Sequence, residues 1–411
     1  MRIIRCLAAA AICATALLGS VACDKFQIET NPYKPIDLST KSLDFAKEGN
    51  SFAFNYLERV DAFAKDDYII SPLSMQFLLG MILDGAQGKT ADEICNVLGY
   101  GADETDDVNE YCLSMLKQLP NRDKKTKLAI ANAIVVNQEY SLLESYKNTV
   151  GKYYEAEVSN MDFTDNVGTT KKINKWCASH TNQLIPEIIE DVDPSALAYL
   201  MNAMYFKSQW KDKFPKGNTA QETFTTEGGT KTSVAMMKAN KSFYYQDNEV
   251  LRAVRLPYGN GAFSMMVILP AEGKTLRDVT KYLDGDKWAD FISMMVRCEV
   301  DLWLPKFETK FRIRLNDILS AMGMPTAFNM FEADFKAMSE RALCLSYVQQ
   351  DAFIKVDEEG TEAAVVSHAG MKADAAAPGE HIVFHADSPF LYLITESSTG
   401  AILFAGRFSG K

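Results

Sequence analysis

The sequence predicts an α+β fold in one large domain. Segments with helical spacing of apolar residues lie mostly early in the chain, whereas apolar runs typical of strands dominate later. No linker-like composition interrupts residues 42–407. At 47% hydrophobic and 24% charged residues, the 411-residue chain has the composition of a globular protein with a large core.

The N-terminus reads as an export signal that is separate from the fold. Arg2 and Arg5 precede a short, alanine-rich apolar run over 6–22. The run ends in LLGSVAC, which resembles a bacterial lipoprotein box and would make Cys23 the lipidated residue. Ser20 departs from the aliphatic residue usual in that box. The alternative is an ordinary secretory peptide cut near Ala22.

The segment after Cys23 predicts a tether over 23–41, because Pro32 and Pro35 accompany no apolar periodicity. The expected organisation is a signal peptide over 1–22, this tether, and a folded domain over 42–411. The protein is therefore expected to be exported and lipid-anchored to a bacterial membrane, on its periplasmic face or at the cell surface, or otherwise secreted.

The net charge of −11 argues against a nucleic acid or an anionic membrane surface as partner. Both are bound mainly through Lys and Arg. A membrane contact is expected only through the N-terminal lipid.

Three segments of the first half predict helices. Residues 50–64 carry apolar side chains at helical spacing. Thr90 and Glu93 form the pattern of a capping box, and Gly99 follows where that helix should end. In 170–180 the apolar face contains Ile173, Trp176, Cys177 and His180.

Long apolar runs and turn signals predict the strands. Residues 128–136 and 196–206 suit a central sheet that is buried on both sides. Turns separate the paired runs of two hairpins. The hairpins are expected over 250–269 and 389–408, a further strand over 300–307, and a short helix over 316–323 that Gly323 closes.

No pattern supports catalysis, a metal or a cofactor. His381 and His385 bracket a predicted strand and would lie about 13 Å apart, too far to bind one metal ion. Nucleophile-elbow, dinucleotide-binding and phosphate-binding motifs are missing. Five scattered cysteines remain after the signal peptide and Cys23, without the spacing of a zinc site or a disulfide framework, and are expected to be buried thiols: Cys95, Cys112, Cys177, Cys298 and Cys344.

Several motifs, in order along the body, resemble the serpin family of serine protease inhibitors. They are ISPLSMQFLLGMILDGAQGKTADEI, NAMYFKSQWKDKF, LPYGNGAFSMMVILP, VDEEGTEAA and FHADSPFLYLI. The resemblance covers about residues 42–407. It implies a single serpin domain with three β-sheets, eight or nine helices and an exposed reactive-centre loop.

The resemblance also implies a mechanism and a partner. A target protease cleaves the loop, stays bound as an acyl-enzyme, and is deformed as the loop inserts into the main sheet. The expected function is suicide inhibition of serine proteases by a monomer, with cysteine proteases as a second class of target. The alternative is a non-inhibitory serpin that binds a ligand or a partner protein.

The loop composition agrees with insertion. Its first proline is Pro378, and alternate residues Thr361, Ala363, Val365 and Ser367 are small or β-branched. The resemblance implies a hinge, here taken as Glu358, Glu359, Gly360, Thr361, Glu362, Ala363 and Ala364. Gly360 is expected to be a flexible pivot.

Counting as the family does places the scissile bond between Asp374 and Ala375. Met371, Lys372 and Ala373 remain alternatives on its N-terminal side.

Ser71, Ser74, Asn202, Trp210 and Gln350 match family positions that control the opening of the main sheet. Gln350 stands where the family usually has a histidine. It can exchange hydrogen bonds with Ser71, Ser74 or Asn202 but cannot become cationic, so no histidine-driven pH response is expected there.

Overall fold

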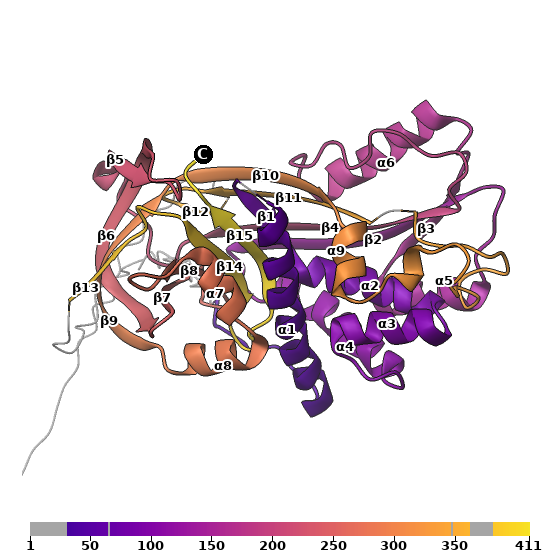
Figure 1. Cartoon of the computed structure of the whole chain (residues 1–411), viewed down its shortest axis with the longest axis horizontal. Coiled ribbons are helices and arrows are strands. Elements are labelled where there is room, and N and C mark those ends of the chain that lie inside the picture. Colours follow the sequence, from indigo (N-terminus) through magenta and orange to yellow (C-terminus); the bar gives the residue numbers. More distant parts are fainter. Residues whose placement is uncertain (1–30, 65, 347, 362–380) are drawn as a thin grey trace, which may run out of the picture. The chain divides into compact units, whose positions relative to one another are not determined.

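The computed structural model describes residues 31–64, 66–346, 348–361 and 381–411, and Pro32–Lys411 form one compact unit (Figure 1). Within the described residues there are nine α-helices, which confirms the expected α+β class. They are α1 (Thr40–Phe63), α2 (Pro72–Gly85), α3 (Gly88–Leu98), α4 (Thr105–Gln118), α5 (Glu144–Tyr154), α6 (Asn166–His180), α7 (Leu276–Tyr282), α8 (Gly285–Ser293) and α9 (Asn316–Met322).

Six of the described strands form a sheet in the order β10-β11-β12-β4-β2-β3. Their bounds are β10 (Phe307–Arg314), β11 (Gln349–Val356), β12 (Gly360–Thr361), β4 (Ala198–Gln209), β2 (Thr126–Asn137) and β3 (Glu157–Met161). The long predicted runs are the central strands β2 and β4, which pair antiparallel over eleven residue pairs from Thr126↔Ser208 to Val136↔Ala198.

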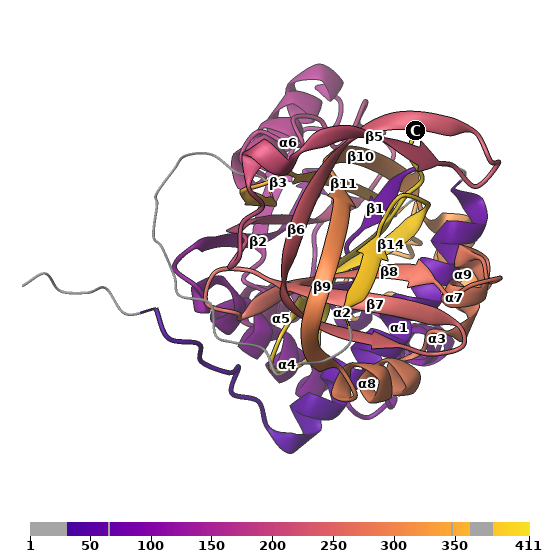
Figure 2. The ribbon, with the colours of Figure 1, turned by 90° about the vertical axis from the view of Figure 1, so that its left-hand side faces the viewer.

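The other nine described strands form a second sheet, so hydrogen bonding yields two sheets where three were expected. The 17-residue strand β6 causes this, because it pairs with β7 at one end and with β9 along most of its length (Figure 2). The strands are β1 (Tyr68–Ile70), β5 (Ala220–Thr225), β6 (Lys231–Asp247), β7 (Leu251–Pro257), β8 (Phe263–Pro270), β9 (Val296–Pro305), β13 (Ile382–His385), β14 (Phe390–Glu396) and β15 (Ile402–Phe408). Both predicted hairpins, β7–β8 and β14–β15, are present.

Strands β2 and β4 are covered on both faces, as their apolar composition predicts. Ile134 and Val136 of β2 point into the main core, which includes α2, whereas Ala133 and Val135 point into a second, smaller core. The second core lies between this sheet and α6, and Figure 1 shows α6 on the side opposite α2.

The predicted capping box of α3 is wrong. The N-cap is Gln87, and the side chains of Thr90 and Glu93 bind a distant loop instead. Thr90 Oγ1 accepts a hydrogen bond from Asp334 N at 2.9 Å, and Glu93 accepts one from Thr326 N at 2.9 Å. The C-terminal signal is confirmed, because Gly99 adopts φ 81°.

The predicted apolar face of α6 is confirmed only in part. Ile173 and Cys177 are buried, whereas Trp176 and His180 are half-exposed. Their tilted rings contact each other with centroids 4.5 Å apart. The cysteine prediction also holds in part, because Cys298 and Cys344 are only half-buried among the five free thiols.

The folded unit begins earlier than the sequence predicts. Ile36, within the segment predicted as a tether, is 6% exposed and joins the main core. Its amide donates to Ser398 Oγ at 2.9 Å, and the backbone of Asp37 exchanges two hydrogen bonds with the side chain of Gln118. The described part of that segment, from Pro32 onward, therefore lies against the body.

Candidate functional site

The hinge begins in a tight turn between β11 and β12. Asp357 Oδ1 accepts hydrogen bonds from the amides of Glu359 and Gly360 at 2.9 and 3.3 Å, which shapes the turn. Beyond it, β12 pairs with β11 through Val356↔Thr361 and with β4 through Gly360↔Gln209 and Thr361↔Ser208. Gly360 and Thr361 of the hinge thus already occupy a strand position inside the sheet.

Gly360 has a structural role that differs from the expected flexible pivot. A Cβ atom there would lie 2.0 Å from Ser208 O and 2.7 Å from Gln209 Cα. These are backbone atoms of β4 that cannot move aside without distorting the strand. Glycine is therefore required because the two backbones approach so closely.

Two glutamates fix the turn to its surroundings. Glu358 is 6% exposed, accepts a hydrogen bond from Thr219 Oγ1 at 2.7 Å, and pairs with Lys306 at 2.8 Å. Burial favours its protonated form, but the hydrogen bonds from Lys306 and Thr219 outweigh burial and hold its pKa below the usual value. Glu359 pairs with Lys213 and Lys216, and the hydrogen bond from Lys213 likewise lowers its pKa.

Trp210 holds the same turn from β4. Its indole Nε1 donates to Asp357 O at 2.8 Å, and its backbone amide donates to Glu359 O at 2.9 Å. Its ring stacks on Tyr258, whose hydroxyl bonds to Thr361 Oγ1. Thr361 is 2% exposed, so its side chain points into the core.

The other predicted control residues form two neighbouring groups. Gln350 accepts from Ser71 N and Tyr56 OH at 2.9 and 3.1 Å, and it donates to Ser71 O at 2.9 Å. Ser74 does not bind Gln350 and instead donates to Asn202 Oδ1.

Asn202 extends the second group across the sheet. Its side chain donates to Asn132 Oδ1 at 2.6 Å, and Asn132 donates to Tyr154 O. The hydrogen-bond partners of Gln350, which are Ser71 and Tyr56, are all uncharged groups.

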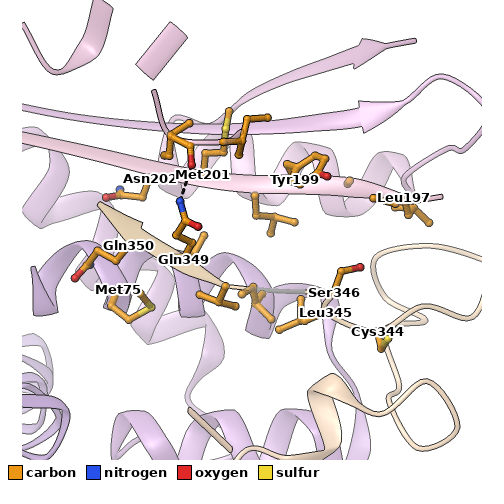
Figure 3. A pocket seen from close by; sticks show the side chains of 18 of the residues that line it. Met75, Leu197, Tyr199, Met201, Asn202, Cys344, Leu345, Ser346, Gln349 and Gln350 are labelled. Atoms are coloured by element: carbon orange, nitrogen blue, oxygen red, sulfur yellow. Dashed lines mark hydrogen bonds between the residues drawn. The ribbon is translucent and has the colours of Figure 1, made fainter. Parts of the chain in front are cut away.

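A cavity of about 90 Å³ lies where β4 and β11 continue past β12. Across it, residues 197–202 face a second group, with Met75 of α2 beneath; that group is Cys344, Leu345, Ser346, Val348, Gln349 and Gln350 (Figure 3). Among the described strands, no pairing joins β4 directly to β11. The cavity is lined by residues 198–202 of β4 and 349–351 of β11, which lie further along the two strands than the partners of Thr361.

Sequence reasoning missed several residues of the site. Tyr56, Asn132, Thr219, Tyr258 and Lys306 all bond to predicted site residues. Most lie more than one hundred positions from their partners, so no local spacing could identify them.

Other predicted residues lie outside the described part of the chain. They are Cys23, Glu362, Ala363, Ala364, Met371, Lys372, Ala373, Asp374 and Ala375. Described chain resumes at His381, and β13 then pairs parallel with β9.

Within the described ranges, no three His, Cys, Asp or Glu side chains are placed to hold a metal ion. In the same ranges, no helix is both long and apolar enough to cross a membrane.

The family model Serpin (serine protease inhibitor) matches residues 47–410. Serpin B6 of Macaca fascicularis is 33% identical over 376 residues, which span 89% of this chain and 100% of that protein.

Two solved structures extend the likeness to the fold. The thermophilic serpin tengpin in its native state has a TM-score of 0.82 at 29% identity, covering 93% of this chain and 98% of that one. Human thyroxine-binding globulin has a TM-score of 0.81 at 26% identity, covering 89% and 98%. The chain therefore belongs to the serpin family, which is a family of serine protease inhibitors and not of enzymes.

Proposed function

We propose that this serpin is a suicide inhibitor of serine proteases, with cysteine proteases as a second class of target. A protease would cleave the segment after Thr361, with Asp374–Ala375 as the first candidate bond and Met371, Lys372 or Ala373 as alternatives before it. The acyl-enzyme would then be trapped as the segment enters the six-stranded sheet. The site lies within one chain, which agrees with action as a monomer.

The position of β12 carries this proposal. Gly360 and Thr361 already lie between β11 and β4, and the cavity lies further along the same two strands, where Asn202 and Gln350 line it. Further residues can add to the strand in the same register without rearranging the hinge turn. Each new ladder hydrogen bond contributes about 0.5–1.5 kcal/mol, so a full strand contributes on the order of 10 kcal/mol. This is comparable to the stability of a whole domain.

The register predicts a polar match on the inner face of the inserted strand. Thr361 points inward opposite Ser208 and Val356, so every second residue after it also points inward. In that register Ser367 would lie between Asn202 and Gln350. Its hydroxyl would meet the two amide side chains, whereas Ala363 and Val365 would meet the apolar core.

The outer face of the inserted strand would have a complementary charge match. Continuing the same pairs places Glu362 opposite Lys207 of β4 and Lys355 of β11. Along the direction of the inserted strand, both lysines come before the part of the sheet that α6 covers. Lys355 is exposed. The one acidic residue in the first part of the insert would thus lie between two cations.

Intact-mass analysis tests the proposal. The protein from residue 24 onward is mixed separately with trypsin-like, elastase-like and aspartate-specific proteases. A species with the mass of protease plus inhibitor, less a C-terminal peptide, is expected, and the mass of that peptide identifies the bond. Cleavage with free, active protease in every mixture would favour a non-inhibitory serpin that binds a ligand, as thyroxine-binding globulin binds thyroxine.

A matched pair of variants tests the insertion step. Ala363→Glu places a carboxylate on the inner face, where burial of an unpaired charge is costly, and should convert the inhibitor into a substrate. Glu362→Ala should still form the covalent complex. The double variant has the wild-type composition with the carboxylate moved by one position, and it should behave as Ala363→Glu does. Equal complex formation by all three would contradict insertion in this register.

We also propose that the protein is exported and lipid-anchored through Cys23, with 1–22 removed. The lipoprotein-like LLGSVAC motif supports this placement. Metabolic labelling with a fatty acid should mark the wild-type protein in an exporting bacterium and not the Cys23→Ser variant.

A further inference from the structure

The N-terminal segment of the folded unit starts over the connection between α4 and β2, residues 119–125. Arg122 Nη1 in this connection donates to Pro35 O at 2.8 Å. Asn260 Nδ2 donates to Pro32 O at 3.4 Å and to Arg122 O at 2.8 Å. These hydrogen bonds fix the start of the described chain beside the α4–β2 connection.

Positively charged side chains gather at the same place. We call Lys34, Arg122, Lys124, Lys125 and Lys127 the basic patch. Lys34 lies in the docked N-terminal segment, and the other four cations lie within the six residues RDKKTK. The four lysines are exposed, and Arg122 is half-buried. The patch therefore presents a dense group of positive charges to the solvent.

The acid within RDKKTK is directed into the protein. Asp123 is 3% exposed, and its carboxylate accepts from Lys125 N at 3.0 Å and from Thr126 Oγ1 at 2.8 Å. On the sheet, Lys127 of β2 lies directly opposite Lys207 of β4. Like charges at opposed positions destabilise a sheet. The arrangement therefore favours an external anion that neutralises these lysines.

The proposed lipid anchor keeps this patch close to a membrane. Asn31, the first described residue, follows Cys23 by eight positions. A chain spans at most about 3.6 Å per residue, so the lipid lies within about 29 Å of Asn31. Charge attraction acts over about 10 Å at ordinary ionic strength, which largely screens acids elsewhere on the protein. The net charge of −11 therefore does not prevent local binding to an anionic surface.

We propose that the basic patch binds the headgroups of anionic phospholipids and holds the anchored serpin against its own membrane. This inference rests on the proposed anchoring through Cys23, which supplies the nearby membrane. A lipid chain together with a basic patch makes two attachments, which bind more firmly than either one alone.

The second attachment would also orient the molecule, because the patch lies at the hinge end of the six-stranded sheet. Thr126, which lies within RDKKTK, and Thr361 both pair with Ser208 of β4. Lipid binding would therefore hold this end of the sheet close to the membrane surface. The segment that a protease would cleave leaves the described body at the same end.

Vesicle flotation tests the patch without the anchor. The protein from residue 24 onward, made without lipid, is mixed with vesicles of phosphatidylcholine or of equal parts phosphatidylcholine and phosphatidylglycerol. The triple variant Lys124→Gln, Lys125→Gln and Lys127→Gln removes three lysines of the patch. Each cation near an anionic surface contributes roughly fivefold in affinity, so this variant should bind the anionic vesicles roughly hundredfold more weakly than the wild type.

A second triple variant controls for net charge. Lys171→Gln, Lys172→Gln and Lys175→Gln replace three exposed lysines of α6 and lower the net charge by the same amount. This variant should bind the anionic vesicles as the wild type does. Added salt should release both proteins, because it screens the attraction.

Wild-type protein that fails to float with anionic vesicles at low salt would overturn the proposal. Equal losses of affinity in the two triple variants would do the same, as would equal binding to phosphatidylcholine alone. Dextran sulfate that binds through the three patch lysines, while vesicles do not bind, would replace the lipid surface with an acidic polysaccharide.

The outcome of flotation is separate from the tests of the proposed function. Flotation uses neither a protease nor the lipid on Cys23. Failure of covalent complex formation would overturn inhibition, and failure of fatty-acid labelling would overturn anchoring, whereas failure of flotation would overturn the basic patch alone.

Discussion

The ring centroids of Trp210 and Tyr258 lie 4.5 Å apart, with 9° between the stacked ring planes, and each side chain hydrogen-bonds to a different residue around β12. Trp210 Nε1 donates to Asp357 O, and the Tyr258 hydroxyl pairs with Thr361 Oγ1. The stack therefore links the turn before β12 to Thr361, the last residue of that strand. Because Tyr258 is fully buried, this contact fixes the side chain of Thr361 inside the core.

A double-mutant cycle on Tyr258 and Thr361 should show coupling. Tyr258→Phe leaves the Thr361 hydroxyl buried without its partner, and Thr361→Val leaves the Tyr258 hydroxyl in the same situation. Each should lower the free energy of unfolding by about 1–3 kcal/mol. The double variant should lose less than the sum, by about 1 kcal/mol or more, because neither polar group is then left unpaired. Chemical denaturation measures all four proteins.

Additive losses, within about 0.5 kcal/mol, would contradict an energetic link between the two hydroxyls. Lys355→Met serves as the control on the neighbouring strand, because the exposed Lys355–Glu308 pair should contribute little.

The sequence was most informative where structure depends on neighbours in the chain. Helical spacing in 50–64, the runs of β2 and β4, and both hairpins could all be predicted, because burial sets their periodicity. Local reasoning failed for Thr90 and Glu93, whose capping pattern is used to bind a loop more than two hundred positions away.

The candidate site was also predictable only in part. Ser71, Ser74, Asn202, Trp210 and Gln350 could be identified from motifs, but their pairing could not. Gln350 takes Tyr56 as a partner, and Ser74 takes Asn202, since tertiary packing decides which amide meets which hydroxyl. The cavity was not predictable, because its lining comes from parts of the chain that are far apart in sequence, such as Ser74, Asn202 and Gln350.

Docking of the segment before α1 should contribute to stability. Ile36→Ala removes a side chain that is 6% exposed in the main core, and it should lower the free energy of unfolding by about 2 kcal/mol. Lys34→Ala, in the same segment, changes an exposed side chain and should have little effect. Denaturant titration compares the two variants, and equal stabilities would mean that the segment behaves as a free tether.

Asp84 should make stability depend on pH. It lies at the end of α2, where burial raises its pKa from 3.8 to about 7 although Asn109 donates to Oδ1 at 2.8 Å. Its Oδ2 is buried and has no hydrogen-bond partner among the described residues. The folded protein therefore favours the neutral carboxylic acid.

The direction of this pH dependence follows from the difference between the pKa of Asp84 in the folded and in the unfolded protein. Below about pH 4 the carboxyl is protonated in both states, so its contribution to stability is fully present. Between about pH 4 and pH 7 only the unfolded chain releases the proton, and the free energy of unfolding falls as pH rises. A shift of about three pKa units sets an upper limit of about 4 kcal/mol on this loss.

Asp84→Asn should remove this part of the pH dependence, because the amide keeps an acceptor for Asn109 and cannot ionise. Unfolding is measured between pH 4 and pH 8 for the wild type and the variant, and the difference between them isolates Asp84 from other titrating groups. The variant should gain stability over the wild type as pH rises. Asp103→Asn changes an exposed carboxylate before the neighbouring helix and should follow the wild-type curve. Parallel curves for wild type and Asp84→Asn would show that this carboxyl is ionised in the folded protein, and that water reaches it behind α2.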